Sequence, residues 1–196
     1  MNRILFPLVA VSLITAGVAA HPADAVAHIS PSARITLDVT RVATPALDDA
    51  TIVAIFDAAN TADIETGDLA AQKAHSQKVR DLGRSFAAAH RAVRQHGRDL
   101  AKKLGVTPTP PANDNSAEMQ AKVMKELRSK SGADFDRAYL QHEVAFHQAV
   151  IDAVTKTLLP AIQNQELKTF VTNVAPAFQM HLAEAQKLLD EQTKGK

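Results

Sequence analysis

Histidines and acidic residues recur at helical spacing in stretches of this chain that are otherwise apolar. Imidazole nitrogens and carboxylate oxygens are the donors with which proteins hold zinc, copper and iron. The five candidates are Glu65, His90, Glu143, His147 and His181. Whether they can act together depends on the helices that carry them and on the faces those helices bury.

The stretch AYLQHEVAFHQAVIDAV, residues 138–154, places two of these groups on the apolar side of a predicted helix. At about 100° per residue, with Phe135 at zero, Phe146 falls at about 20°. Glu143 falls at about 80° and His147 at about 120°, so both lie in the apolar stripe one turn apart. His142 falls at about 340°, at the edge of the stripe or outside it.

Two further histidines lie on the inward faces of their predicted helices. His90 stands four residues after Phe86, and His181 stands three residues after Phe178. Both intervals keep a side chain on one face of a helix. The other histidines are expected at the surface: His21, His28, His75 and His96.

Glu65 completes the set from the first predicted helix, three residues after Ala62 and four before Leu69. It lies on one flank of the apolar stripe of that helix. Each of the five groups occupies the middle of its own helix, and the middles of bundled helices share a layer. We therefore expect the five side chains to converge.

A layer of this kind needs a partner for its charges, because an unpaired buried charge costs several kcal/mol. Three imidazoles and two carboxylates predict a site for one transition-metal ion: copper, zinc or iron. The alternative is a metal-free network in which glutamate and histidine satisfy one another and fix the register of the helices.

The elements that position these residues are four long helices, in each of which apolar residues repeat at intervals of three and four residues. The predicted ranges are 48–75, 76–104, 133–159 and 163–191. Short links pair the first helix with the second and the third with the fourth. The loop VTPTPPANDNS and a short helix over 116–130, which caps the bundle or fills the crossover, connect the pairs. The prediction is an all-α, up-down four-helix bundle over residues 48–192.

Local signals set the predicted helix boundaries. Asp48 or Asp49 is expected to cap the first helix and Ser76 the second, because short polar side chains accept free backbone N–H groups. Gly105 follows the second helix and favours the left-handed conformation that ends helices. Pro160 is expected to stop the third helix because proline has no backbone N–H.

The first 25 residues have the layout of a secretory signal peptide. One positive charge at Arg3 precedes an uncharged run from residue 4 to residue 20, and small residues follow. Cleavage after Ala20 or Ala25 is expected, the alternative being an uncleaved membrane anchor. We expect export to the periplasm or beyond, with no stable membrane span after cleavage. Residues 26–47 are predicted to be an extended lead-in, in which RITLDVT alternates like a weak strand.

Composition narrows the functional classes. The net charge of +1 gives no basic patch or stripe, so no nucleic-acid partner is expected. The chain has no cysteine, which excludes disulfides, thiolate metal ligands, a cysteine nucleophile and a cysteine-linked lipid anchor. Aromatic residues make up only 4% of the chain, and the alanine-rich remainder favours close helix packing.

Four segments carry a resemblance to a known family: ANTADIETGDLAAQKA, VRDLGRSFAAAHRAVRQHGRDLAKKLGV, FDRAYLQHEVAFHQAVI and LKTFVTNVAPAFQMHLAEAQKL. In order and spacing they resemble the exported bacterial proteins of domain-of-unknown-function family 4142. The resemblance implies a ferritin-like four-helix bundle behind a signal peptide. It implies the matching polar positions Glu65, His90, His147 and His181, with Tyr139 and Pro176 as structural positions. It implies no reaction.

One feature argues against a carboxylate-bridged di-iron centre. Ferritin-like di-iron proteins carry Glu-x-x-His on two helices. Here Ala87, Val144 and Phe178 stand three residues before the inward histidines. A single histidine-rich metal site is therefore the favoured prediction.

Three functional classes follow from these residues. The first is an exported metal-binding protein, and the second a non-catalytic envelope or stress-related interaction protein with a metal-free polar network. An enzyme ranks last, because no Gly-x-Ser-x-Gly, phosphate loop or nucleotide fingerprint occurs in the chain.

Overall fold

The computed structural model describes residues 47–194, and every regular element in that range is helical. The elements are α1 (Asp49–Lys73), α2 (Gln77–Leu104), α3 (Ser116–Ser129), α4 (Gly132–Ala153), the π-helical turn η1 (Val154–Leu158), α5 (Leu159–Ala161) and α6 (Gln165–Lys194). The all-α prediction is confirmed for the described residues. The predicted signal peptide, and the lead-in up to residue 46 with its strand-like RITLDVT, lie outside them.

The helix boundaries agree closely with the local signals in the sequence. Asp48 caps α1, its carboxylate accepting the backbone N–H of Thr51 at 2.8 Å. Gly105 ends α2 with φ of 67°, in the left-handed region where glycine carries no steric penalty. Ser76 holds the N-cap position of α2, but its side chain makes no capping hydrogen bond.

Pro160 does not stop the third predicted helix at the expected residue. It lies inside α5, and the chain leaves the helical conformation at Ile162, where ψ is 124°. Just before the proline, the N–H of Leu159 bonds the carbonyl of Val154, which is a π-helical spacing. Proline cannot donate in its own turn, and this helix continues past it through the widened turn η1.

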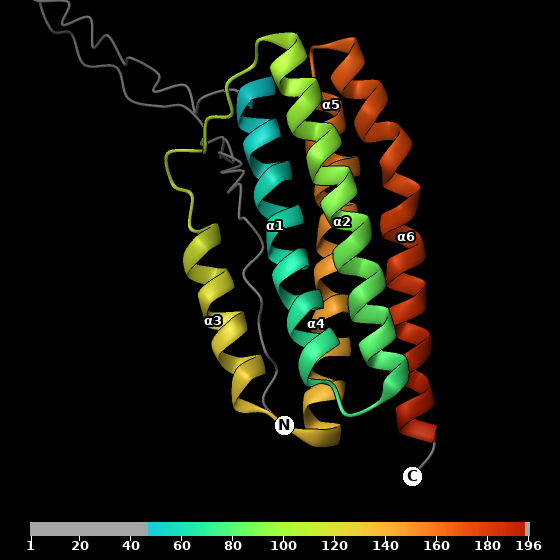
Figure 1. Ribbon diagram of the computed structural model, residues 1–196. Coiled ribbons are helices and arrows are strands. Elements are labelled where there is room, and N and C mark those ends of the chain that lie inside the picture. The colour runs from blue at the N-terminus through green and yellow to red at the C-terminus, as the bar shows by residue number, and fades with distance from the viewer. Residues whose placement is uncertain (1–46, 195–196) are drawn as a thin grey trace, which may run out of the picture. The chain divides into compact units, whose positions relative to one another are not determined.

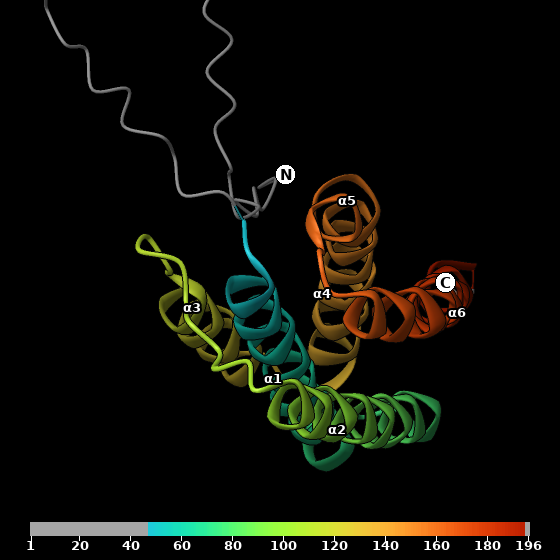
Figure 2. The ribbon, with the colours of Figure 1, turned by 90° about the horizontal axis from the view of Figure 1, so that it is seen from above.

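The four long helices α1, α2, α4 and α6 lie side by side (Figure 1), as the view along their axes also shows (Figure 2). The most extensive helix contacts are those of α1 with α2 and of α4 with α6. Contacts of α2 with α6 and of α1 with α4 join the two pairs. The short helix α3 lies beside α1, which it contacts, and it also contacts α4, the helix that follows it in the chain (Figure 2).

Two glycines bring α1 and α2 together. A Cβ atom on Gly67 would lie 2.7 Å from the carbonyl oxygen of Gly83, and one on Gly83 would lie 2.6 Å from that of Gly67. Real Cβ atoms do not approach backbone so closely, so only glycine permits this spacing. The two backbones touch in the C-terminal half of α1, one turn after Asp63.

Two aspartates tie each helix pair to the loop of the other pair. Asp136, on α4, accepts the backbone N–H groups of His75 and Ser76, both at 2.7 Å, in the α1–α2 turn. Asp49, on α1, accepts those of Gln163 and Asn164 at 2.9 and 2.8 Å, before α6. These carboxylates satisfy backbone N–H groups in the turns just before α2 and α6.

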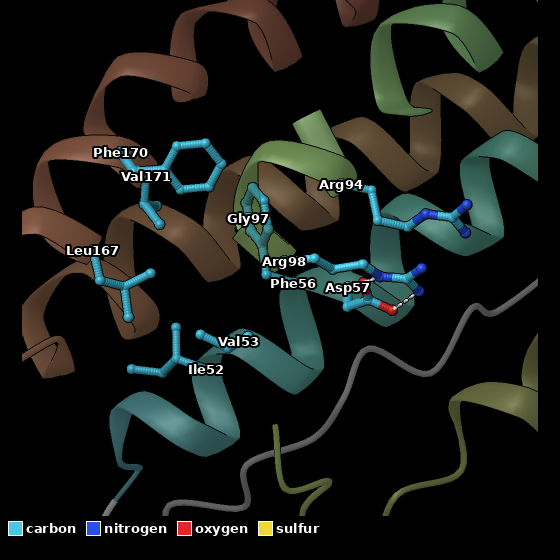
Figure 3. A pocket seen from close by; sticks show the side chains of 10 residues that line it. All are labelled: Ile52, Val53, Phe56, Asp57, Arg94, Gly97, Arg98, Leu167, Phe170 and Val171. Atoms are coloured by element: carbon cyan, nitrogen blue, oxygen red, sulfur yellow. Dashed lines mark hydrogen bonds and ion pairs between the residues drawn. The ribbon is translucent and has the colours of Figure 1, made fainter. Parts of the chain in front are cut away.

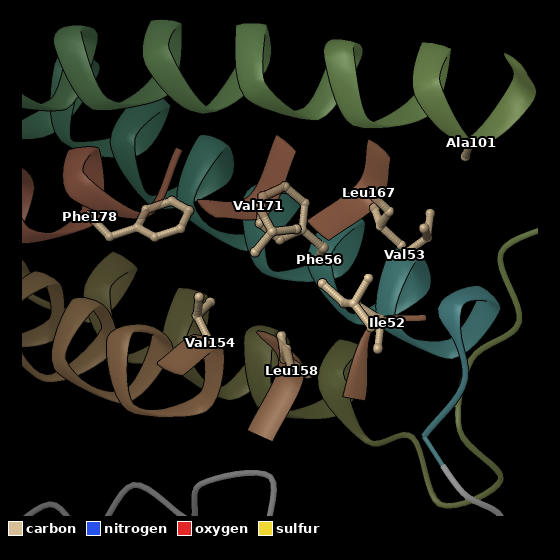
Figure 4. Packing of buried hydrophobic residues seen from close by; sticks show 10 residues of the cluster. Ile52, Val53, Phe56, Ala101, Val154, Leu158, Leu167, Val171 and Phe178 are labelled. Atoms are coloured by element: carbon tan, nitrogen blue, oxygen red, sulfur yellow. The ribbon is translucent and has the colours of Figure 1, made fainter. Parts of the chain in front are cut away.

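The apolar core is divided into two clusters. One cluster, shown in Figure 4, contains Ile52, Val53, Phe56, Ala101, Val154, Leu158, Ile162, Leu167, Val171 and Phe178. The other contains Ala70, Ala74, Val79, Leu82, Phe86, Leu127, Phe135, Tyr139, Leu140 and Ala185. Along all four long helices, the residues between the two clusters include buried polar side chains. A polar layer therefore crosses the middle of the core.

Candidate metal centre

One side chain from each long helix contributes to a compact group in this polar layer. The four are Asp63 of α1, His90 of α2, His147 of α4 and His181 of α6. One donor atom from each lies within 4.8 Å of the other three. The layer forms because each helix places a polar residue at a core position between its apolar neighbours.

The distances between the donor atoms suit a four-coordinate metal ion. Asp63 Oδ2 lies 2.6 Å from His90 Nε2 and 3.3 Å from His147 Nε2. His181 Nδ1 lies 3.1 Å from His90 Nε2 and 3.3 Å from His147 Nε2. Metal–ligand bonds of about 2.0–2.1 Å separate neighbouring donors by about 2.9 Å in a square and about 3.3 Å in a tetrahedron. The residues present therefore fit one ion.

Hydrogen bonds on the far side of two rings determine which nitrogen faces the centre. Nδ1 of His90 donates to Asn60 Oδ1 at 2.9 Å, and the Asn60 amide donates to the carbonyl of Phe56, which fixes its orientation. Nδ1 of His147 donates to the carbonyl of Glu143 at 3.0 Å. Both Nε2 atoms are left to point lone pairs inward, the arrangement that surrounding hydrogen bonds give to metal-binding histidines.

Asp63 carries the negative charge of the group. Burial by itself raises its pKa, but a hydrogen bond and charge from His90 and the charge of His147 outweigh this and lower the pKa to about 2. The neutral carboxyl group of Glu143 is one donor to Asp63. While His90 keeps its proton on Nδ1, its Nε2 has no proton to donate to Asp63 Oδ2. Two lone pairs then face each other across 2.6 Å, which requires a cation between them, either a proton or a metal ion.

Two of the imidazoles are held in the neutral form that binds metals. Burial lowers the pKa of His147, against the attraction of the Asp63 charge. Burial, reinforced by the charges of His147 and His90, lowers the pKa of His181 to about 4. Neutral rings keep a lone pair free at neutral pH, so a metal ion need not displace protons from these two side chains.

A second buried carboxyl group lies beside the centre. Glu143 is fully buried, with Oε2 3.4 Å from Nδ1 of His147 and Oε1 accepting the hydroxyl of Thr66 at 3.2 Å. Burial and then the charge of Asp63 raise its pKa well above the usual value. Burial and the charges of Glu143 and Asp63 raise the pKa of the neighbouring Tyr139 too. The inward position predicted for Glu143 is therefore found, although it is not one of the four converging donors.

Glu65 does not join the group. It is exposed, and its carboxylate accepts the side-chain amide of Gln120 on α3 at 2.9 Å. Asp63, two residues earlier, occupies the position in the centre that was predicted for Glu65. The sequence held a usable signal, because Asp63 stands seven residues after Phe56, two helical turns along the same face, whereas Glu65 stands nine residues after it on the opposite face.

His142 is buried rather than at the edge of α4 or outside it, with 7% of its surface exposed. Because α3 packs against α4, this helix buries a wider arc than the apolar stripe alone indicates. Burial lowers the pKa of His142 to about 4. His75 and His96 are exposed as predicted, while His21 and His28 lie outside the described residues.

A surface hollow lies elsewhere, between α1, α2 and α6 (Figure 3). Ile52, Phe56 and Phe170 give it apolar walls, and Arg94 and Arg98 line it as well. It does not include any of the four converging residues. Separately, none of the helices in the part of the chain described is long and apolar enough to span a membrane.

Fold and site together define an all-helical protein with an Asp/His cluster, buried at its centre, of the kind that holds a metal ion. The chain belongs to the family described as Domain of unknown function (DUF4142), whose sequence pattern it matches over residues 37–188. The resemblance carried by the four sequence segments is thereby confirmed. A search of curated proteins and a search of solved structures each returned no match.

Proposed function

We propose that this chain is an exported, ferritin-like four-helix bundle that binds one transition-metal ion, copper, zinc or iron. Asp63, His90, His147 and His181 would hold the ion. The observation that carries the proposal is the convergence of four donor atoms, from four helices, at spacings of 2.6 to 3.3 Å along four of their six edges. These spacings match ordinary four-coordinate geometry.

The set of four donors favours a protein that binds a metal ion over an enzyme that uses the ion in a reaction. A catalytic zinc site has three protein ligands and one open position, whereas four protein ligands close a site. His90, His147 and Asp63 are at most 3% exposed, which leaves little access for a substrate. A bound copper or iron ion could also exchange electrons, and a zinc ion could not. The role proposed is therefore metal binding or handling, without a reaction.

Export is proposed from the N-terminal sequence. The positive Arg3, the uncharged run to residue 20 and the small residues around Ala25 support a cleaved signal peptide. The mature chain would then occupy the periplasm or the extracellular space. No nucleic-acid partner is proposed, because the net charge of the whole chain is +1.

The competing proposal is a metal-free interaction protein of the cell envelope. The 2.6 Å contact between Asp63 and His90 favours it, because a proton can occupy the same place as a metal ion. In that case the polar layer only fixes the register of the helices. Replacing His147 by alanine would then change the melting temperature without changing the binding of any metal.

The test uses two acidic residues on the same helix. Asp63→Asn removes the charged donor from the cluster, and Glu65→Gln makes the same chemical change at an exposed site two residues away. We expect titration calorimetry with Zn²⁺ and Cu²⁺ to show one site per chain in the parent and in Glu65→Gln. Asp63→Asn should bind at least about 100-fold more weakly, because surrounding residues alone contribute 10- to 100-fold. Equal binding by all three proteins would reject the site.

A further inference from the structure

We infer that metal ions enter and leave this site through the seam between α2 and α6, with His181 as the ligand that swings away and Phe86 as the ring that holds it in place. This inference rests on the proposed metal binding and adds a route to it. If the ion exchanges by this route, the protein carries it as cargo and does not keep it as a permanent part of the fold.

Exposure distinguishes His181 from the other donors. It keeps 8% of its surface exposed, whereas His90 keeps 3%, Asp63 1% and His147 none. An ion that approaches from solvent therefore meets the His181 ring before the other three. His181 belongs to α6, whose contacts with α2 are far less extensive than its contacts with α4, so the α2–α6 seam is the looser of the two that flank it.

His181 is also the histidine with the weakest hold from its surroundings. The rings of His90 and His147 are anchored through Nδ1, by Asn60 and by the carbonyl of Glu143. Nδ1 of His181 faces the cluster instead, and no described residue makes a hydrogen bond to its Nε2. Rotating His181 outward therefore breaks no hydrogen bond outside the site.

On the opposite side of the site, between α1 and α4, helix α3 holds α1 in place. Helix α3 packs against both of these helices. Its Gln120 donates to the carbonyl of Ala62, at 3.1 Å, and to Glu65, at 2.9 Å, on either side of Asp63. Opening this seam requires α3 to separate from α1, whereas no described helix packs across the α2–α6 seam from outside.

The surface hollow of Figure 3 is a poor alternative route for a cation. Its inner wall includes Phe56, whose ring packs 6.2 Å from that of the buried Phe178 and separates the hollow from the core. Arg94 and Arg98 line it, and two guanidinium groups repel a metal ion. Asp57, bound to Arg98 at 2.5 and 2.8 Å, offsets only part of that charge.

Phe86 packs directly against the exchange ligand. Its ring is stacked on the His181 ring, with centroids 4.2 Å apart and planes 23° from parallel, and it is fully buried. Phe178 offers a matched control because it is stacked on the inner ligand His90, with centroids 5.9 Å apart, and is 2% exposed. Phe86 also meets the inner ligand His147 edge-on, with centroids 5.4 Å apart. Phe86→Leu therefore loosens the outer ligand together with one contact of an inner ligand, whereas Phe178→Leu loosens the inner ligand His90 and leaves the stacking on His181 in place.

The experiment measures how fast the folded protein loses a loaded ion. Parent, Phe86→Leu and Phe178→Leu are loaded with Co²⁺, and the decay of the Co²⁺ absorption is followed in excess chelator. A rate that does not depend on chelator concentration reports opening of the protein. We expect Phe86→Leu to accelerate the loss about tenfold, because a cavity beside His181 lowers the cost of local opening. Phe178→Leu should stay within about threefold of the parent.

Equal acceleration in the two variants, or none in Phe86→Leu, would overturn the route while leaving metal binding intact. Failure of the parent to load Co²⁺ would instead reject the proposed function, so the two failures are distinguishable. Phe86→Met leaves a similar gap but has a flexible side chain that adapts to it, and it supplies the test if the leucine variant does not fold. It too is expected to release Co²⁺ faster than Phe178→Met.

Discussion

Replacing Gly67 by alanine is expected to destabilise the protein, although alanine is the better helix former. The new Cβ would lie 2.7 Å from the carbonyl oxygen of Gly83 and 3.1 Å from the Cβ of Ala87. The carbonyl is backbone and cannot rotate away, so α1 and α2 must move apart. Overpacking of this kind costs about 1–3 kcal/mol.

Gly97 provides the matched control within α2. A Cβ at Gly97 would lie 3.5 Å from the ring of Phe170, which is ordinary van der Waals contact. Both substitutions gain the same helix propensity of about 1 kcal/mol, so this contribution cancels in their difference. We expect Gly97→Ala to unfold at higher urea than the parent and Gly67→Ala at lower urea, about 1–3 kcal/mol apart.

The assay is urea unfolding of the metal-free proteins, followed by circular dichroism, with equal slopes required for the comparison. Metal titration supplies a second readout, because Gly67 lies one turn after Asp63 and its replacement should separate Asp63 from His90. Gly97→Ala should bind metal like the parent. Two variants of equal stability would refute the argument that backbone contact sets the α1–α2 spacing.

Three further predictions follow from the same structure. The folded pKa of His142, about 4, lies below the ordinary 6.5, so the unfolded chain takes up a proton first. Stability should therefore fall as the pH drops from about 6.5 to 4, and His142→Phe should flatten that fall. Asp136→Ala should lower the free energy of unfolding, measured in urea, by about 3 kcal/mol, because two backbone N–H groups lose their acceptor. The Asp48→Ala cap variant should lower it by about 1 kcal/mol. Zn²⁺ at about 100 times its dissociation constant should stabilise the parent by about 2.7 kcal/mol and His147→Ala by far less.

The fold was largely predictable because apolar residues repeat at helical spacing over four long segments. Helix α2, predicted over 76–104, spans Gln77–Leu104. The short helix expected over 116–130 spans Ser116–Ser129. Pro160 was less informative, because a π-helical turn lets the chain continue past it. No pattern in the sequence identified Asp136 as the cap of a loop sixty residues earlier.

The site was predictable where its polar residues stand among large apolar neighbours. His90, His147 and His181 were placed inward because Phe86, Phe146 and Phe178 mark those faces. On α1 the inward face carries Asn60, Asp63 and Gly67, which lower its hydrophobicity. The half-buried flank with Ile55, Ala59 and Leu69 therefore looked like the core, and Glu65 was chosen instead of Asp63. Because the inward face of α1 is polar at the centre, the apolar pattern did not identify Asp63, the fourth residue of the site.

The metal content of the protein as it leaves the cell tests the central claim most directly. The untagged chain would be purified from the periplasm without chelator, beside the His90→Ala, His147→Ala, His181→Ala triple variant, and both analysed by mass spectrometry for copper, zinc and iron. The account predicts close to one ion per chain in the parent and none in the variant. No metal in either protein, together with flat titrations of the parent, would contradict it and leave the polar layer as a structural network.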